Sequence, residues 1–354
     1  MNEEHLSKGS RIAIISEFIN EQTSEGIRKF AKELADAYED MEFKVARFGA
    51  RTSPRGKGRS LFRRAIEILD QRKRLSEYRP DLLIYIPSSN RIFLNLLKLR
   101  LWRKSAERSA MILLLPPRGR WSFSKMISKD VHLFIQFNAS SIPEGISKKN
   151  IRYIPSGVDV DEFMPAHADE KARLKTELGI KPDERVVLSV GHLTTGRRLD
   201  ILIDASKGVN ARFVFVSSDM PTDDPKIQVS LESAGIILIK RFLPRIQDIY
   251  GSADCYLFTT GSPDSAIGMP LSILEAMSMN IPVVTRDFSS LSKNLGGPSE
   301  DKGIYFINDE KNVIEKIEQA LALKEVRTRS IALDFTWKGI AERILGEIGE
   351  RADD

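Results

Sequence analysis

The sequence predicts an α/β protein made of two tandem, Rossmann-like, doubly wound domains. Short apolar segments of strand length alternate with amphipathic helical segments along most of the 354 residues, which is typical of parallel sheets covered by helices. The alternation stops once, at Pro155–Pro165 (PSGVDVDEFMP), where turn residues occur without periodicity. The length suits two domains of ordinary size. We therefore expect one domain over residues 1–155, a second over 166–330, and a closing segment over 331–354.

The first domain opens with an apolar strand, Arg11–Ile15, followed by a helix whose apolar positions between Ile27 and Tyr38 have a helical period. The segment Arg51–Arg59 is basic and interrupted by proline and glycine, so we expect a mobile loop there. The remaining strands are predicted at Phe43–Phe48, Leu82–Ile86, Met111–Leu115, His132–Gln136 and Ile151–Ile154, and the remaining helices at about Leu61–Leu75 and Asn90–Lys104.

The second domain repeats this alternation. Its strands are predicted at Val186–Val190, Phe213–Val216, Ile236–Ile239, Cys255–Thr259, Ile281–Val284 and Tyr305–Ile307. Its helices are predicted at Leu199–Ala205, Ile246–Tyr250, Leu271–Met279 and Val313–Leu323, and an amphipathic helix at Trp337–Ile348 closes the chain. Ligands of parallel α/β sheets bind at the carboxyl ends of the strands, so two such domains predict a ligand-binding cleft.

One stretch of the second domain, Ala253–Val284, has the features of an anion site. A buried strand leads through a Gly- and Ser-rich loop to a helix that begins at about Pro270. Peptide N–H groups without partners at a helix start, together with the helix dipole, favour an anion. Glu275 follows on the same helix, where its carboxylate can accept hydrogen bonds from hydroxyls beside that anion. A phosphate with a neighbouring diol indicates a nucleotide, although a glycine-proline helix start and a solvated glutamate are also common without a ligand.

Composition and charge restrict the class of partner. The chain has 42% hydrophobic residues and no apolar run near the roughly 20 residues of a membrane span. Its net charge is only +5, yet the segment from Lys44 to Lys129 contains 22 Lys and Arg against 5 Asp and Glu, a net charge of +17. Such a basic segment indicates a phosphate-bearing substrate, an anionic membrane surface or nucleic acid. Nucleic acid is disfavoured because no recognition module accompanies the charge.

The expected location is cytoplasmic, with the inner face of the membrane as an alternative. The first ten residues, MNEEHLSKGS, are polar and lack the apolar core of a signal peptide. The single cysteine, Cys255, excludes an intramolecular disulfide and fits a reducing compartment.

The predicted helix Asn90–Lys104 leaves two interpretations open. One stripe of the helix contains Arg91, Asn95, Lys98 and Trp102, and apolar side chains surround the rest. This composition resembles a helix that lies on anionic lipid. The alternative is a core helix with a solvated basic face.

Four segments of the chain resemble motifs of one known family. They are IPSGVDVDEFMP (Ile154–Pro165), VGHLTTGRRLDILIDA (Val190–Ala205), IYGSADCYLFTT (Ile249–Thr260) and GMPLSILEAMSMNIPVV (Gly268–Val284). In this order and spacing they resemble the retaining, metal-independent group 1 glycosyltransferases with the two-domain GT-B fold. The resemblance implies two domains that face each other across a cleft, and a closing helix at Trp337 that crosses back to the first domain.

The resemblance also assigns donor-site residues. Glu275 takes the position of the ribose ligand, and Gly268 and Met269 supply backbone N–H groups near the phosphates of a nucleoside-diphosphate sugar. Arg197 takes the position of the phosphate-binding lysine, in the loop that starts at Gly191. An arginine suits that position because its planar fork matches phosphate oxygens. The implied catalysis is electrostatic stabilisation of the departing diphosphate, without a metal or cofactor.

Four departures from the family pattern are present, and one of them is the segment Ser217-Ser218-Asp219-Met220-Pro221, which stands in place of a G-x-G-P turn after a middle strand. His192 stands where the family has a second basic residue, and it is mostly neutral at pH 7 unless a bound diphosphate raises its pKa. Arg198 replaces a glycine. Ile267 replaces a glutamate that contacts the transferred sugar, so Asp264 in the preceding loop is a candidate substitute. These departures leave a second function open, a non-catalytic GT-B protein that binds a nucleotide sugar or serves as a partner subunit.

The acceptor is expected on the basic first domain. Arg118 and Arg120 follow a predicted strand of that domain, where many members of the family present a histidine to the sugar. The charge of the domain predicts an anionic or lipid-linked acceptor. Asp159 and Asp161 imitate the D-x-D motif of metal-dependent transferases, but they lie in the interdomain segment, so no metal site is expected.

Overall fold

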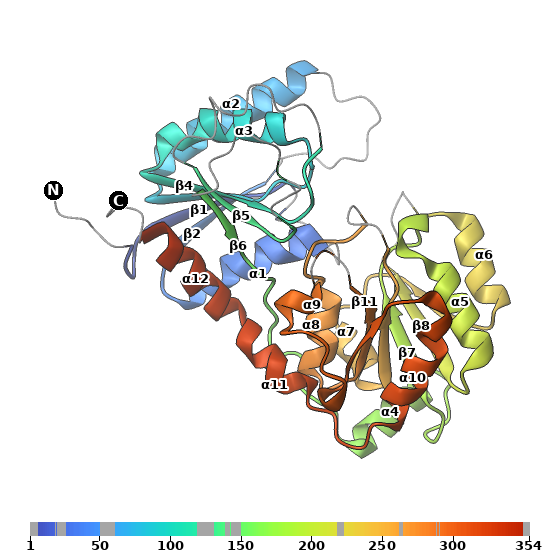
Figure 1. The fold of residues 1–354 in the computed structure, drawn as a ribbon. Coiled ribbons are helices and arrows are strands. Elements are labelled where there is room, and N and C mark those ends of the chain that lie inside the picture. The colour runs from blue at the N-terminus through green and yellow to red at the C-terminus, as the bar shows by residue number, and fades with distance from the viewer. Residues whose placement is uncertain are drawn as a thin grey trace. The chain divides into compact units, whose positions relative to one another are not determined.

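The structure is a computed structural model that consists of two compact units. It describes residues 6–17, 19, 26–49, 61–118, 131–138, 142, 150–217, 223–261, 265–287, 289 and 291–349, without the side chains of 61–65. One unit comprises Met1–Gly157 with Trp337–Asp354, and the other Val158–Thr336. Residues 331–336, which the sequence grouped with the closing helix, belong to the second unit. Each unit is a parallel sheet covered by helices on both faces (Figure 1).

The first unit contains a six-stranded sheet in the order β2-β1-β3-β4-β5-β6, and all of its pairs are parallel. The strands are β1 (Arg11–Ile15), β2 (Lys44–Phe48), β3 (Leu82–Tyr85), β4 (Arg108–Leu113), β5 (His132–Ile135) and β6 (Ile151–Tyr153). Almost every residue of β1, β3 and β4 is buried. Continuous apolar strands of this kind are expected in a sheet with both faces covered.

Two pairs of helices cover this sheet. Helices α2 (Leu61–Tyr78) and α3 (Ile92–Trp102) lie on one face, and α1 (Gly26–Asp40) and α12 (Trp337–Gly349) on the other (Figure 1). The ring of Trp337 meets that of Phe30 edge-on at a centroid distance of 5.1 Å, and the Tyr38 hydroxyl donates to the Ala341 carbonyl at 3.4 Å. The last helix of the chain therefore packs on the first, as the resemblance implied.

The second unit repeats the architecture in the strand order β12-β11-β10-β7-β8-β9. Its strands are β7 (Val186–Val190), β8 (Arg212–Ser217), β9 (Ile237–Lys240), β10 (Cys255–Phe258), β11 (Val283–Arg286) and β12 (Ile304–Ile307). Its helices are α4 (Ala168–Glu177), α5 (Leu199–Gly208), α6 (Pro225–Ser233), α7 (Ile246–Gly251), α8 (Leu271–Ser278), α9 (Leu291–Asn294), α10 (Val313–Ala322) and α11 (Thr328–Ala332). Residues of α7 and α8 share one apolar core, and those of α5 and α10 share the other.

The elements differ from the predicted ones in a few places. β11 starts at Val283 rather than at Ile281, because Pro282 has no N–H group to donate to a neighbouring strand. Helices α4 and α6 were not predicted. In α4 only two side chains are buried, so its sequence has little helical periodicity. In α6 the signal was present, since Asp224 caps the helix by accepting from the N–H group of Lys226 at 2.9 Å, and Pro225 is the first residue.

Within the predicted polar stripe of α3, Asn95 and Trp102 are buried and Lys98 is partly buried, whereas Arg91 is exposed, so only Arg91 keeps the expected solvated position. The Asn95 amide donates to the carbonyl of Ser89 at 2.7 Å, and the Trp102 indole donates to that of Ile68 at 3.1 Å. Lys98 pairs with Glu17 at 2.9 Å. Each polar group has a partner, which makes its burial tolerable. The exposed residues of α3 are Phe93, Leu94 and Leu97, together with Arg100. No helix in the described part of the chain is long and apolar enough to cross a membrane.

The chain crosses between the two units twice, after Gly157 and after Thr336. In the first unit, a Cβ atom on Gly157 would lie only 2.5 Å from the ring of Trp337, so glycine is required there. In the second unit, the Val158 N–H donates to the carbonyl of Phe335 at 2.8 Å. The predicted connection at Pro155–Pro165 contains the first of these two passages.

Candidate functional site

The topology of the second unit marks a position for a ligand. Strands β7 and β10 are neighbours, but the chain continues from β7 to β8 on one side and from β10 to β11 on the other. Loops that leave two neighbouring strands in opposite directions open a crevice at the carboxyl edge of the sheet, where ligands of such sheets bind. The two loops here are residues 191–198 and 259–270. They contain every residue predicted for the donor site except Glu275, which is on α8.

The first loop presents Arg197. Thr259, which directly follows β10, donates its hydroxyl to the carbonyl of Arg197 at 2.6 Å. The guanidinium Nη1 donates to the Thr260 hydroxyl at 3.3 Å, and Cζ lies 5.7 Å from the centroid of the Phe258 ring. A Cβ atom on Gly191 would lie 3.4 Å from Nη1, an ordinary van der Waals distance, so the guanidinium lies beside the backbone at Gly191. Two neighbouring strand ends thus hold the side chain of Arg197.

The electrostatics of this loop are those of a site for an anion. Arg197 Nε and His192 Nδ1 are buried, and neither has a hydrogen-bond partner among the residues that the structure describes. Burial lowers the pKa of Arg197 to about 10, so the side chain stays charged at neutral pH. Burial, together with the charge of Arg197, lowers the pKa of His192 to about 4, so its imidazole is neutral. A partly buried cation without a carboxylate partner is costly unless a ligand supplies the negative charge.

The second loop leads to the start of α8, and its residues are packed closely. Gly268 and Met269 are buried, and Pro270 is the N-cap residue of α8, without a side-chain capping hydrogen bond. Glu275 is only 6% exposed, and the Tyr250 hydroxyl donates to its Oε2 at 2.8 Å. The predicted phosphate-binding helix start and the predicted ribose ligand therefore belong to one helix at the carboxyl edge of the sheet.

The two loops also contact each other. The N–H group of Gly261 donates to the carbonyl of Gly196 at 3.4 Å. A Cβ atom on Gly196 would lie 1.9 Å from the hydroxyl oxygen of Ser265, so only glycine allows this approach. The contact brings the segment that presents Arg197 against the segment that leads to α8.

The second unit is similar in sequence to a known protein family. Residues 184–322 match the family model described as glycosyl transferases group 1. The chain is 25% identical over 234 residues to mannosylfructose-phosphate synthase of Agrobacterium fabrum, an alignment that covers 58% of this chain and 49% of that protein. The match to the group 1 glycosyltransferases lies within the second unit. The chain spans about half the length of the curated relatives that it matches.

Solved structures show the same fold. The structure of HepE from Anabaena in complex with UDP-glucose has a TM-score of 0.72 and 15% identity, and covers 96% of this chain and 99% of that chain. A glycosyltransferase from Rickettsia africae has a TM-score of 0.77 and 13% identity, and covers 99% of this chain and 100% of that chain. At these identities the likeness shows the fold alone, and the predicted two-domain GT-B fold is confirmed.

The departures of this chain from the family motifs lie partly within the described residues. The side chain of Ile267 is 7% exposed, so an apolar residue is buried at the position of the sugar-contacting glutamate. Asp264, its candidate substitute, lies outside the described residues, as does the loop Arg51–Arg59. The carboxylate of Asp159 accepts from the N–H groups of Asp161 and Glu162 at 3.0 and 2.9 Å, which is a turn-stabilising arrangement.

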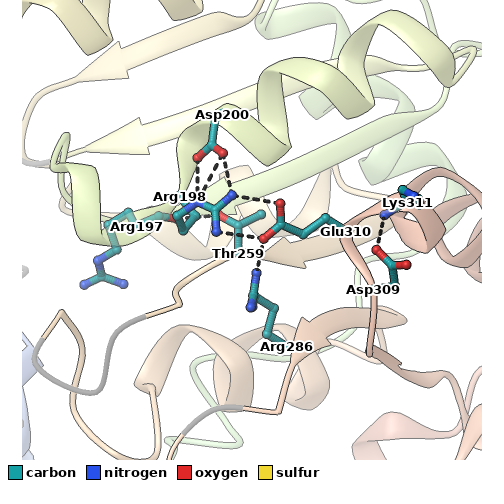
Figure 2. Close-up of polar contacts among 8 residues, drawn as sticks. All are labelled: Arg197, Arg198, Asp200, Thr259, Arg286, Asp309, Glu310 and Lys311. Atoms are coloured by element: carbon teal, nitrogen blue, oxygen red, sulfur yellow. Dashed lines mark hydrogen bonds and ion pairs between the residues drawn. The ribbon is translucent and has the colours of Figure 1, made fainter.

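Arg198 belongs to a charged cluster that the sequence did not predict. It forms hydrogen bonds with Asp200 and Glu310, and Arg286 also donates to Glu310 (Figure 2). Arg286 ends β11, and Glu310 follows the end of β12. Both therefore lie at the carboxyl edge that carries Arg197. Because both residues end or follow predicted strands, the sequence could have indicated that they lie at this edge. It could not indicate that they contact Arg198, because that depends on the order of the strands in the sheet.

On the first unit, the acceptor candidates are resolved in part. Arg118 is exposed, and its N–H group donates to the carbonyl of Asn90 at 2.6 Å, so it lies at the carboxyl edge near the end of β3. Arg120 lies outside the described residues. The sequence missed Glu17, which follows Ser16 after the end of β1 and whose side chain is 22% exposed. It accepts hydrogen bonds from the N–H group of Ser88 at 2.9 Å and from Lys98 at 2.9 Å.

Proposed function

We propose that this protein transfers a sugar from a nucleoside-diphosphate-sugar donor to an anionic or lipid-linked acceptor, with retention of anomeric configuration and without a metal ion. The observation that carries the proposal is the guanidinium of Arg197, which is partly buried and has no carboxylate partner among the described residues. In a site of low dielectric such a cation attracts a diphosphate strongly. The UDP-glucose bound to the structurally similar HepE supports a nucleotide sugar as the donor.

In the proposed donor complex, Arg197 and the start of α8 hold the diphosphate. Negative charge grows on the diphosphate as its bond to the sugar breaks, and a fixed cation and a helix start stabilise that charge. His192 is neutral in the free protein, but a neighbouring diphosphate raises the pKa of its imidazole and lets it donate a hydrogen bond. Glu275 accepts from the ribose hydroxyls, and Asp264 remains the proposed contact to the sugar.

The donor proposal is tested by ligand binding. Nucleoside diphosphates and their sugars are screened for a rise in melting temperature, since a ligand that binds only the folded state stabilises it. Arg197→Ala and Glu275→Ala should each lose the rise, whereas Arg212→Ala, an exposed arginine at the start of β8, should keep it. If no compound raises the melting temperature of the wild-type protein, the donor site is wrong.

The non-catalytic alternative is favoured by one observation, the buried side chain of Ile267 at the position of the sugar-contacting carboxylate. The discriminating measurement is slow hydrolysis of a bound donor in the absence of an acceptor. Release of nucleoside diphosphate that depends on Arg197 would establish chemistry. Tight binding without turnover across all donors would favour the non-catalytic protein.

For the acceptor side, the proposal includes docking of the first unit on an anionic membrane. The neighbouring helices α2 and α3 expose apolar side chains that are 36–58% accessible: Ile66, Leu69, Phe93, Leu94 and Leu97. Exposed basic residues follow on both helices, namely Arg72, Lys73 and Arg100, and Lys104 lies in the short 3-10 turn after α3. Apolar side chains that enter the lipid and cations that meet its headgroups are typical of helices lying on anionic bilayers.

Sedimentation with phosphatidylglycerol vesicles at low salt tests the docking. The wild-type protein should sediment with the vesicles, and Leu94→Ser with Leu97→Ser should reduce this. Leu333→Ser, which changes an equally exposed leucine of the second unit, is the matched control. Absence of wild-type binding would contradict the membrane proposal and leave the donor site untouched.

A further inference from the structure

Arg198 has an unusual backbone conformation. Its φ and ψ angles are 50° and 49°, in the left-handed region, where a residue with a Cβ atom is strained by roughly 1 kcal/mol. The residue separates the short 3-10 turn Thr195–Arg197 from helix α5, and its carbonyl accepts from the N–H group of Ile201 at 3.1 Å. A strained residue persists only where surrounding contacts hold it.

The side chain of Arg198 supplies those contacts. Its Nε and Nη2 donate to the carboxylate of Asp200 at 2.7–3.1 Å. Its Nη1 and Nη2 donate to the two oxygens of Glu310 at 2.7 and 2.8 Å, and Arg286 donates to Glu310 at 2.8 Å. Two-point contacts between a guanidinium and a carboxylate fix geometry as well as charge. We call Arg198, Asp200, Glu310 and Arg286 the anchor cluster.

The anchor cluster and Arg197 lie on opposite sides of the same turn. Figure 2 shows the guanidinium of Arg197 pointing away from Asp200 and Glu310, whereas that of Arg198 points into them. The left-handed conformation of Arg198 produces this divergence, because it turns the chain sharply between two adjacent side chains. The donors of Arg198 are occupied by two carboxylates, so Arg198 is not itself available to a phosphate.

We propose that Arg198 and Glu310 are positioning residues, which hold the loop so that the guanidinium of Arg197 is directed at the diphosphate of the donor. The inference rests on the proposed function, because it assigns a role to the neighbours of the donor-binding arginine. The carboxylate of Glu310 is about half exposed, so solvent screens its ion pairs and their contribution to overall stability is small. Their contribution is to geometry.

The test uses the full chain, with UDP and inorganic pyrophosphate as probes in isothermal titration. Pyrophosphate has the diphosphate without a base, so it reports on Arg197 rather than on the rest of the nucleotide. Arg198→Gly tolerates the left-handed turn but loses the side chain, and Glu310→Gln loses the charge that Arg198 and Arg286 share. We expect each variant to bind both probes about 5-fold more weakly, as for coupled residues of one network. The melting temperature should change little.

The control is Glu300→Gln, which removes a similar carboxylate that Lys316 contacts at 2.7 Å, before the start of β12 and outside the anchor cluster. It should leave both affinities unchanged. A further comparison separates positioning from general loosening. In an Arg197→Ala background, where UDP retains the start of α8 and Glu275, Glu310→Gln should have no additional effect on the affinity for UDP.

Three outcomes decide against the anchor. Unchanged affinities in Arg198→Gly and Glu310→Gln overturn it while the donor site stands. An equal loss from Glu310→Gln with and without Arg197 also overturns it, because the effect then does not pass through Arg197. If the wild-type protein binds neither UDP nor pyrophosphate, the proposed donor site fails and the anchor loses its role with it.

Discussion

The two units place different chemistry at equivalent points of their sheets. In the first sheet β1 and β3 are neighbours whose chains continue to opposite sides, as β7 and β10 do in the second. At the first point the carboxylate of Glu17 accepts from Lys98 and from the N–H and hydroxyl groups of Ser88. At the second point Arg197 and His192 each keep a buried nitrogen without a partner among the described residues.

The groups at the first position form an ion pair that stabilises their own unit. The groups at the second position are suited to bind a ligand. Burial raises the pKa of Glu17, but Lys98 and the N–H group of Ser88 outweigh it, so the pKa is below the usual value and the carboxylate stays charged. The ion pair of Glu17 and Lys98 is therefore balanced without a ligand. The second point leaves a cation uncompensated, which natural proteins retain where binding requires it. Four substitutions test whether the groups of the first unit contribute to stability and those of the second unit to ligand binding.

The largest effect is expected from Arg197→Ala. Loss of a partly buried, charge-assisted contact to a diphosphate should weaken UDP binding by about 100-fold. The free energy of unfolding should change by no more than about 0.5 kcal/mol, because the protein offers the side chain no carboxylate to lose. Titration calorimetry and urea unfolding measure the two quantities. A large loss of stability with unchanged UDP affinity would show that Arg197 stabilises the protein and does not bind the ligand.

The second effect is expected from Glu17→Ala in the first unit. It leaves Lys98 partly buried without its carboxylate, so the free energy of unfolding should fall by about 2 kcal/mol while UDP affinity stays unchanged. Addition of Lys98→Met should restore part of the stability, because the double substitution removes the unpaired cation as well. Loss of UDP binding on Glu17→Ala would show that the first point takes part in donor binding.

A smaller effect is expected from Gly196→Ala, which pushes a methyl group against Ser265 and separates the two loops of the donor site. UDP binding should weaken about 10-fold because Arg197 moves relative to α8. Ser265→Gly in the same chain removes the obstructing side chain and should recover most of the affinity. Failure of that second substitution would mean that the loops do not act through this contact.

The smallest effect concerns pH. The pKa of His192 is about 6.5 in an unfolded chain, whereas burial and Arg197 lower it to about 4 in the folded protein. Between these values the unfolded chain binds more protons, so stability falls as the pH decreases. From about pH 7.5 to about pH 5.8 the wild-type protein should lose about 1 kcal/mol more than His192→Asn. Urea unfolding at the two pH values measures it, and equal losses would contradict the lowered pKa.

Much of the fold followed from local patterns. Continuous apolar strands such as β3 and β10 and the period of α1 are local features, and they predicted the elements within a few residues. The helix α3 shows where such patterns fail. Asn95 and Lys98 were expected on a polar stripe of this helix, whereas the structure buries Asn95 and partly buries Lys98. A polar side chain is buried when a distant partner satisfies it, and Glu17 lies 81 residues from Lys98.

The donor site, too, was predicted only in part from local patterns. The sequence by itself determined the two α/β domains, the helix start after Gly268 and Glu275 as a candidate ligand, because each depends on residue type and local spacing. Arg197 became a candidate through the resemblance to a known family. Only the tertiary structure decided that Tyr250 would hold Glu275, that Ser265 would meet Gly196, and that Glu310 would anchor Arg198. The physical reason is the order of parallel strands, which brings loops from distant parts of the chain to one edge of the sheet.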